Sequence, residues 1–245
     1  MAKWKARSGT RGALAIILAG LAGCGKANQG DTRHDSVAVS ASAQSNPSEG
    51  GAPQRPSRPV VLFVGTSLTA GLGLDPDSAY PMLIQRKIDS AGLHFDVVNA
   101  GVSGETSSGL LDRLDWLTRA TFDVLVLETG ANDGLRGIPP ATLHANIDTA
   151  IDRLRAKRPD ARLVLVQMEA LPNLGAKYAA DFHAVYPAVA KEKRVPLLPF
   201  LLANVAGKRE LNQADGVHPN YLGEPIVADN VWRGLRPLLM AGFGA

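Results

Sequence analysis

The strongest constraint on the fold of this chain is the alternation of short apolar runs with longer segments of helical periodicity. The run VVLFVG at residues 60–65 is continuous in its hydrophobicity, which is typical of a strand buried on both faces. Similar runs follow at residues 95–101, 122–130, 161–169 and 195–200, the last interrupted by prolines. Helical patterns occupy the intervals and the end, at residues 80–92, 107–120, 139–159, 177–194 and 227–242. Strands joined by helices form a parallel sheet covered on both sides, so we expect an α/β fold with about five strands.

Polar and glycine-rich segments follow the first three expected strands and precede the last expected helix. They are Gly65-Thr66-Ser67, NAGVSGET at 99–106, TGANDG at 129–134 and DGVHPN at 215–220. Turn geometry alone would explain each of them, because Gly, Asn and Asp are common turn residues. In open parallel sheets, however, sites form beyond the carboxyl ends of the strands. We therefore expect the four segments to meet at one edge of the sheet.

Together these segments contain every group that acyl transfer requires. Ser67 is the candidate nucleophile, His218 the candidate base, and Asp215 the carboxylate that orients the imidazole. The backbone N–H groups of Ser67 and Gly104 and the side-chain amide of Asn132 would form an oxyanion hole. Glycine at position 104 lets the backbone approach a substrate without an intervening side chain.

The four blocks resemble those of the SGNH (GDSL-like) hydrolases, named for Ser, Gly, Asn and His. Ser67, Gly104, Asn132 and His218 match residue by residue, and the resemblance extends from about Val60 to Leu239. The segments GANDGLRG, VPLLPF and DGVHPN look like the bacterial periplasmic branch of thioesterases, lysophospholipases and arylesterases. The resemblance implies a flavodoxin-like three-layer α/β/α sandwich, no metal and no cofactor. A Gly-x-Ser-x-Gly elbow is excluded, because the second residue after the serine is a threonine.

One position departs from the family pattern. SGNH hydrolases generally carry an aspartate after the glycine of the first block, where it helps to hold the loops of the site and is not the triad acid. This chain has Thr66 there, which keeps a hydroxyl and lacks the charge. Because Asp215 supplies the triad carboxylate, our hypothesis is that Thr66 tunes the site and leaves catalysis in place.

Two loops are candidates for contacts with the substrate. The segment DGLRGIPP, after the oxyanion asparagine, is a mobile loop over the acyl site in the branch that the chain resembles. The segment EALPNLG, after the fourth expected strand, would lie across the cleft. Arg136 would either meet an anionic head group or stay in solvent. The candidate substrate-binding residues are Asp133, Gly134, Leu135, Arg136, Leu171 and Pro172.

These observations favour a serine esterase that acts on acyl or aryl esters through an acyl-Ser67 intermediate, with lysophospholipids and acyl thioesters as plausible substrates. One alternative is a carbohydrate acetylesterase, an activity that many SGNH proteins have. Another is a non-catalytic lipoprotein that keeps the fold as a binding module, a view that only Thr66 supports. Loss of turnover in Ser67→Ala would separate enzyme from binding module.

The first residues are expected to be a signal peptide, spanning 1–23. A basic leader precedes the apolar stretch ALAIILAGLAG, which is too short for a membrane-spanning helix. It ends in LAGC, which resembles the lipobox of bacterial lipoproteins and would make Cys24 the acylated residue. A plain signal peptide with a chance cysteine is the alternative. Residues 24–58 are rich in Ser, Gly, Pro and Ala and predict a disordered tether, which leaves 59–245 as the hydrolase domain.

The charge balance argues against a nucleic-acid partner. The whole chain has 26 Lys and Arg against 23 Asp and Glu. Removal of residues 1–23 takes away four basic residues and no acidic ones, which leaves 22 against 23. We therefore expect an exported, lipid-anchored monomer on the periplasmic side of a membrane or at the cell surface, with a small ester as substrate and no nucleic acid. Because Cys24 is the only cysteine, the fold has no intramolecular disulfide.

Overall fold

The computed structural model describes residues 58–241, so the predicted signal peptide, Cys24 and residues 24–57 of the predicted tether lie outside the described residues. Residues 58–241 contain a parallel sheet of five strands in the order β2-β1-β3-β4-β5. This order and the alternation of strands with helices confirm the predicted α/β fold. The strands are β1 (Val60–Gly65), β2 (Asp96–Gly101), β3 (Val124–Leu127), β4 (Arg162–Val166) and β5 (Leu197–Leu198).

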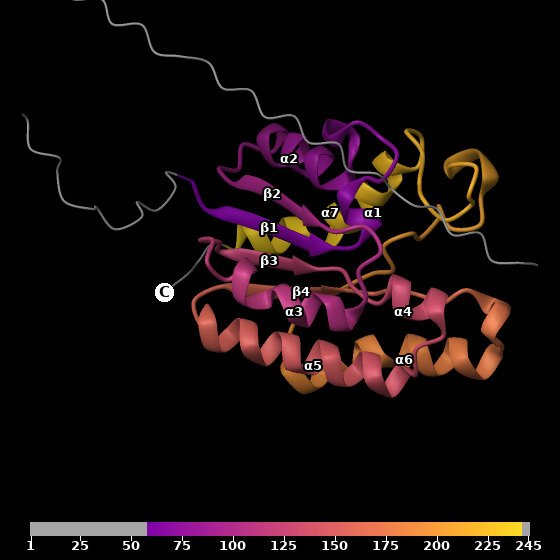
Figure 1. Cartoon of the computed structure of the whole chain (residues 1–245). Helices are drawn as coiled ribbons and strands as arrows, with labels where there is room; N and C mark the ends of the chain where they lie inside the picture. The colour runs from indigo at the N-terminus through magenta and orange to yellow at the C-terminus, as the bar shows by residue number, and fades with distance from the viewer. Residues whose placement is uncertain (1–57, 242–245) are drawn as a thin grey trace, which may run out of the picture. The chain divides into compact units, whose positions relative to one another are not determined.

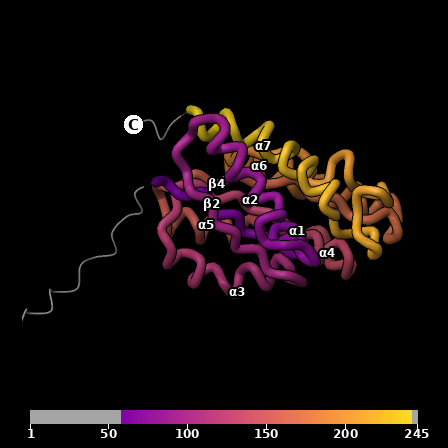
Figure 2. The backbone as a smooth tube through the Cα atoms, turned by 90° about the horizontal axis from the view of Figure 1, so that it is seen from above, coloured from indigo at the N-terminus to yellow at the C-terminus, as the bar shows by residue number. Residues whose placement is uncertain are grey.

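Helices cover the sheet in two groups. The first group is α2 with α7, which pack against each other, and the second is α5 with its two neighbours α3 and α6. Figure 2 looks down on the sheet and places α3 and α7 on opposite sides of it. The helices are α1 (Ser67–Ala70), α2 (Tyr80–Ser90), α3 (Ser107–Leu117), α4 (Ala131–Arg136), α5 (Pro140–Lys157), α6 (Ala176–Lys193) and α7 (Glu224–Met240), with short 3-10 turns at Pro76–Ser78, Pro172–Leu174 and Arg209–Leu211.

The burial of each strand explains its sequence. All six residues of β1 are buried, because β1 is a central strand with helices over both faces. The edge strand β2 is only partly buried, and it carries Asp96 and Asn99 among its apolar residues.

Between residues 58 and 241, no helix combines the length and the hydropathy needed to cross a membrane.

Every strand after β1 is shorter than its apolar run, and the reason is clearest for β3 and β5. β3 ends at Leu127, because the chain then turns at Thr129 and Gly130 toward α4, with Gly130 in the left-handed region at φ 97°. β5 contains only Leu197 and Leu198 of the run at 195–200, since proline cannot donate to a strand ladder and stands on either side.

The carboxyl ends of the strands all point to one edge of the sheet. In Figure 1 the strand arrows point toward α1 and α4, where the yellow loop that precedes α7 also lies. The register pairs Gly65 with Gly101 at the end of β1 and β2, so the two loops that follow start side by side. This edge is where the sequence predicted that the polar segments would meet.

Candidate active site

Ser67, His218 and Asp215 form a continuous chain of hydrogen bonds at this edge. The hydroxyl of Ser67 lies 2.8 Å from Nε2 of His218. Nδ1 of the same imidazole lies 2.7 Å from Oδ2 of Asp215. A serine, its base and the carboxylate that fixes the tautomer of the base therefore stand in the order that nucleophilic catalysis requires.

The loop around Asp215 holds that carboxylate in its charged form. The backbone N–H groups of Val217 and His218 donate to Oδ1 of Asp215, at 2.9 Å and 3.0 Å. Desolvation alone would raise the pKa of Asp215, but the hydrogen bonds from His218 and Val217 outweigh it and lower the pKa to about 2. The carboxylate is thus ionised wherever His218 acts as a base.

The candidate nucleophile, Ser67, stands at the start of the one-turn helix α1. Thr66 is its N-cap residue, and the Thr66 hydroxyl accepts a hydrogen bond from the Leu68 N–H at 3.4 Å. Ser67 follows at the first helical position and is 8% exposed, so its hydroxyl is held in a mostly buried turn. The departure at Thr66 therefore sits directly beside the nucleophile.

The buried carboxylate of Glu128 holds this turn in place through hydrogen bonds. It accepts hydrogen bonds from the backbone N–H of Thr66 at 2.7 Å, from the Thr66 hydroxyl at 3.0 Å and from the Thr69 hydroxyl at 2.9 Å. Burial raises the pKa of Glu128, and the bonds from Thr66 and Thr69 oppose that rise. Gly65 makes the arrangement possible, since a Cβ there would collide with Thr69 and Glu128.

The three predicted oxyanion-hole groups belong to the segments that follow β1, β2 and β3 at the same edge. Gly104 has φ 80°, a left-handed conformation that favours glycine. The Asn132 amide donates to the backbone carbonyl of Glu105 at 2.9 Å, which ties the asparagine to the loop that carries Gly104. Preorganised donors of this kind stabilise the negative charge that develops on a carbonyl oxygen.

An apolar cavity of about 330 Å³ opens among the same loops. Leu68, Ala131 and Val217, the chain neighbours of Ser67, Asn132 and His218, line it. Glu169 is the only charged side chain in the lining, and its carboxylate pairs with Nδ1 of His183 at 2.7 Å. The remaining lining residues are Gly134, Leu135, Met168, Ala170, Leu171, Pro172, Phe200, Leu202, Ala206, Gly207 and Gly216.

Four of the six predicted substrate-binding residues line this cavity, namely Gly134, Leu135, Leu171 and Pro172. Asp133 does not line it. Its side chain is fully buried, and its two carboxylate oxygens accept hydrogen bonds from the Ser107 N–H at 2.8 Å and from the Ser107 hydroxyl. Asp133 therefore fixes α4 to the start of α3.

Arg136 is exposed but turns toward the oxyanion-hole loop. Its guanidinium donates to the backbone carbonyl of Gly104 at 3.0 Å, and it is not part of the cavity lining. The structure therefore places Arg136 against the loop of the second sequence block.

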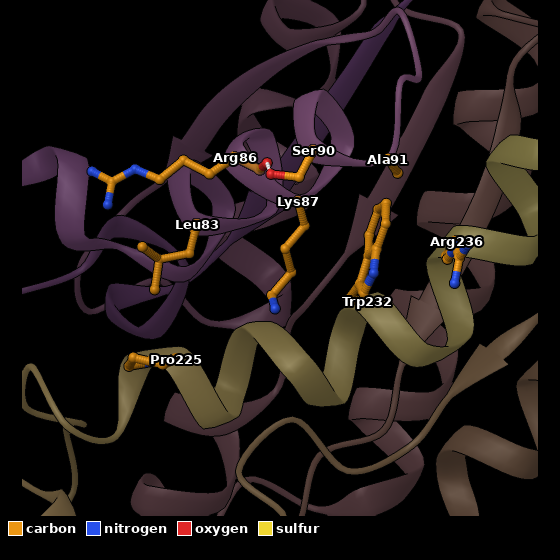
Figure 3. A pocket seen from close by; sticks show the side chains of 8 residues that line it. All are labelled: Leu83, Arg86, Lys87, Ser90, Ala91, Pro225, Trp232 and Arg236. Atoms are coloured by element: carbon orange, nitrogen blue, oxygen red, sulfur yellow. Dashed lines mark hydrogen bonds between the residues drawn. The ribbon is translucent and has the colours of Figure 1, made fainter.

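A larger groove, of about 550 Å³, lies between α2 and α7. Figure 3 shows Lys87 reaching from α2 toward α7, and Trp232 rising from α7. Lys87 is paired with Asp229 of α7 at 2.6 Å. None of the triad or oxyanion-hole residues lines this groove, so the site is the smaller, apolar cavity.

Sequence reasoning missed Glu128 and part of the cavity. A carboxylate at the end of the apolar run FDVLVLETG was a usable signal for Glu128, because buried charges need specific partners. Met168, Phe200, Leu202 and Ala206 reach the cavity from two separate segments. No local pattern distinguishes them from ordinary core residues.

The comparisons with known proteins agree with this geometry. Residues 63–224 match the model of the GDSL-like Lipase/Acylhydrolase family. The chain is 40% identical to esterase TesA of Pseudomonas aeruginosa, over 76% of this chain and 92% of that protein. It is 37% identical to the thioesterase 1/protease 1/lysophospholipase L1 of Escherichia coli K12, over 73% of this chain and 84% of that protein.

Among solved structures, the psychrotrophic esterase EstA from a Pseudoalteromonas species superimposes with a TM-score of 0.70. The alignment has 31% sequence identity and covers 74% of this chain and 98% of EstA. The shared sheet, the four sequence blocks and these matches lead to one assignment. The chain belongs to the GDSL-like lipase/acylhydrolase family, the SGNH hydrolases, and is a serine esterase of that family.

Proposed function

We propose that this esterase hydrolyses acyl and aryl esters through an acyl-enzyme formed on Ser67. The observation that carries the proposal is the unbroken chain of hydrogen bonds from Asp215 through His218 to Ser67, beside an apolar cavity. A hydroxyl alone is a weak nucleophile at neutral pH, and an oriented imidazole is what activates it.

In the acylation half, Ser67 Oγ attacks the carbonyl carbon of the ester while its proton passes to Nε2 of His218. Asp215 holds Nδ1 and stabilises the imidazolium that forms. The carbonyl oxygen becomes an oxyanion and accepts bonds from the N–H groups of Ser67 and Gly104 and from the Asn132 amide. The C–O or C–S bond then breaks, and the leaving alcohol or thiol takes the proton from Nε2.

In the deacylation half, a water molecule attacks the carbonyl carbon of the acyl-Ser67 ester. His218 Nε2 accepts the proton of that water, and the same three donors stabilise the second oxyanion. The bond between Ser67 Oγ and the acyl carbon breaks, Oγ recovers the proton, and the carboxylic acid leaves. The enzyme returns to its starting state.

The apolar cavity supports an acyl chain or an aromatic ring as the recognised part of the substrate. Its volume lies at the lower end of the range for small-molecule sites, about 300–1,000 Å³. The names of the relatives agree with such substrates, since they are an esterase and a thioesterase with lysophospholipase activity. The EstA structure is described as inhibited by monoethylphosphonate, an inhibitor whose chemistry suits an activated serine.

Hydrolysis of p-nitrophenyl esters from acetate to palmitate tests the proposal, with Ser67→Ala and His218→Ala measured beside the unaltered chain. We expect turnover that both substitutions abolish, and Ser67-dependent labelling by a fluorophosphonate probe. An optimum at acetate, with no gain from longer chains, would favour the carbohydrate acetylesterase alternative. If a folded protein showed neither turnover nor labelling, the result would favour the alternative of a non-catalytic binding module.

We also propose that the protein is exported and anchored to a membrane through acylated Cys24. The support is the sequence alone, namely the basic leader, the short apolar stretch and the LAGC motif. Mass spectrometry of the mature N-terminal peptide would reveal an acylated Cys24, and Cys24→Ala would release the enzyme from the membrane fraction. An unmodified N-terminus that begins at another residue would contradict the anchor.

A further inference from the structure

A mostly buried ion pair includes Glu105, the residue next to Gly104 in the chain, and has no part in the mechanism described above. Arg113, on α3, and Glu105, on the loop after β2, have side chains that are only 16% and 5% exposed. Both carboxylate oxygens of Glu105 are bonded, Oε1 by Nε and Oε2 by an Nη of Arg113, the latter at 2.8 Å. The contact is therefore the bidentate kind, which fixes direction as well as distance.

The same guanidinium reaches a second loop. An Nη of Arg113 also donates to the backbone carbonyl of Gly65, at 3.4 Å, at the end of β1. The N–H of Val102 donates to the same carbonyl at 2.8 Å. Arg113 thus holds the end of the strand that leads to Ser67 and, through Glu105, the loop that carries Gly104.

The third oxyanion-hole group is joined to this network through the backbone of Glu105. The carbonyl of Glu105 accepts the hydrogen bond from the Asn132 amide at 2.9 Å. A displacement of Glu105 would therefore move the acceptor that orients Asn132 as well as the adjacent Gly104 N–H. One arginine is thus connected to all three segments that supply donors to the oxyanion, directly or through Glu105.

Stability alone is a poor explanation for a buried pair of this kind. Replacement of a buried ion pair by apolar residues is often neutral or stabilising, because desolvation offsets the attraction between the charges. The oxyanion hole, by contrast, depends on donors placed to within a fraction of an ångström of the developing charge. A bidentate guanidinium supplies that placement, which a lysine ammonium with its single point of charge does not.

We propose that Arg113 is a positioning residue that sets the geometry of the oxyanion hole through Glu105 and Gly65. The inference rests on the proposed function, because it concerns the same oxyanion. Arg113 does not touch the substrate. Its effect should appear in the transition state and not in binding of the ester.

The test compares Arg113→Met, Arg113→Lys and the double variant Arg113→Met/Glu105→Leu with the unaltered full chain. The readouts are kcat and KM for p-nitrophenyl butyrate, and Ki for an alkyl trifluoromethyl ketone, whose adduct with serine carries an oxyanion. We expect each variant to lose about 10- to 100-fold in kcat with little change in KM. Across the variants, Ki should rise in proportion to the loss of kcat/KM.

Arg153→Met is the matched control, because Arg153 also joins a carboxylate, Asp115, to a backbone carbonyl, that of Leu111. It should leave kcat and Ki unchanged. Thermal melting separates a positioning role from a role in folding. The double variant leaves no unpaired charge, so its melting temperature should be close to that of the wild type, while its kcat should remain reduced. If Arg113→Met is insoluble, Arg113→Lys and the double variant carry the test.

Two results would overturn the inference. One is wild-type kcat in the double variant or in Arg113→Lys. The other is a loss of kcat that correlates with a lower melting temperature across the variants while Ki stays unchanged. A wild-type chain without turnover or Ser67 labelling would instead overturn the proposed function, and this inference with it. Wild-type activity that survives in the Arg113 variants removes the inference alone.

Discussion

The hydroxyl of Ser67 and Nε2 of His218 lie 2.8 Å apart, although 151 positions separate the two residues in the chain. Ser67 follows β1, while His218 belongs to the loop before α7, and α7 reaches the core by packing on α2. The contact therefore depends on the docking of the last helix, and small shifts of that loop would break it.

Asp215→Asn should lower kcat by about 10⁴-fold and change KM little. The asparagine amide would present an N–H to Nδ1 of His218, which favours the tautomer that cannot accept the Ser67 proton. Steady-state kinetics on a p-nitrophenyl ester measures the effect. Asp181→Asn is the control, because Asp181 lies in an exposed pair with Lys177. A loss smaller than about tenfold would show that Asp215 does not orient the base.

Asn132→Ala should lower kcat by about 10²- to 10³-fold, as expected for the loss of one oxyanion donor. One hydrogen of the Asn132 amide is held by the Glu105 carbonyl, which leaves the other for the oxyanion. Labelling of Ser67 by a fluorophosphonate should slow in parallel, because the phosphonyl oxygen uses the same hole. Unchanged kcat would exclude Asn132 from the hole.

Thr66→Asp, which restores the usual residue of the family, should destabilise this protein and not improve it. The new carboxylate would lie beside the buried Glu128, whose oxygens are bonded to the Thr66 hydroxyl at 3.0 Å and 3.1 Å. Two adjacent carboxylates raise one pKa by about 2–3 units, which corresponds to about 3–4 kcal/mol at neutral pH.

Urea unfolding at neutral and acidic pH would measure this penalty, and it should shrink as the pH falls and one carboxyl group becomes protonated. Thr66→Asp/Glu128→Gln removes the like charge and should recover most of the stability. A Thr66→Asp variant as stable as the wild type, with higher kcat, would mean that the missing aspartate limits this enzyme.

Glu224 should make the stability of the protein fall as the pH rises. It is 2% exposed, Oε2 lacks a hydrogen-bond partner within residues 58–241, and burial raises its pKa from 4.5 to about 8. The folded state thus binds more protons than the unfolded state between about pH 4.5 and 8. The stabilising contribution of Glu224 to the free energy of unfolding is complete below the pKa of the unfolded state. It is lost as the pH rises through the pKa of the folded state, and the free energy of unfolding falls by up to about 1.4 kcal/mol per pH unit.

Urea denaturation of Glu224→Gln and wild type across this range gives the test. The variant should gain stability over the wild type as the pH rises, because the amide never ionises. Glu210→Gln, at an exposed position, should follow the wild-type profile. Parallel profiles for wild type and Glu224→Gln would show that Glu224 does not titrate in this range.

Ala206→Trp should shorten the acyl chains that the enzyme accepts. Ala206 lines the apolar cavity, and an indole there would fill much of its 330 Å³. We expect kcat/KM for p-nitrophenyl octanoate to fall by about tenfold or more while that for the acetate stays unchanged. Ala180→Trp, on the exposed face of α6, is the control. Equal losses for both esters would place the acyl chain elsewhere.

The alternation of strands and helices could be predicted because buried parallel strands read as continuous apolar runs. The grouping of the candidate catalytic residues could be predicted for a related reason. Parallel strands end at one edge, so Ser67 and Asn132, distant in sequence, had to be close in space. His218 was found through its spacing from Asp215 within one loop.

The rest depends on contacts that no local pattern records. Asn132 and Asp133 are neighbours in one short helix, but the first reaches the Glu105 carbonyl and the second is buried against Ser107. Sequence alone gives no means to decide which of the two faces the substrate. Similarly, the two partners of Glu128, Thr66 and Thr69, lie 62 and 59 positions earlier in the chain.

The proposed nucleophile and its proposed base lie far apart along the chain. A ribosome adds Ser67 and all five strands of the sheet before it adds Asp215 and His218. The growing polypeptide therefore carries a serine without its base until α7 has emerged and joined α2. A chain that ends before residue 215 would therefore hold the candidate nucleophile without its base, and hydrolysis would require the nearly complete domain.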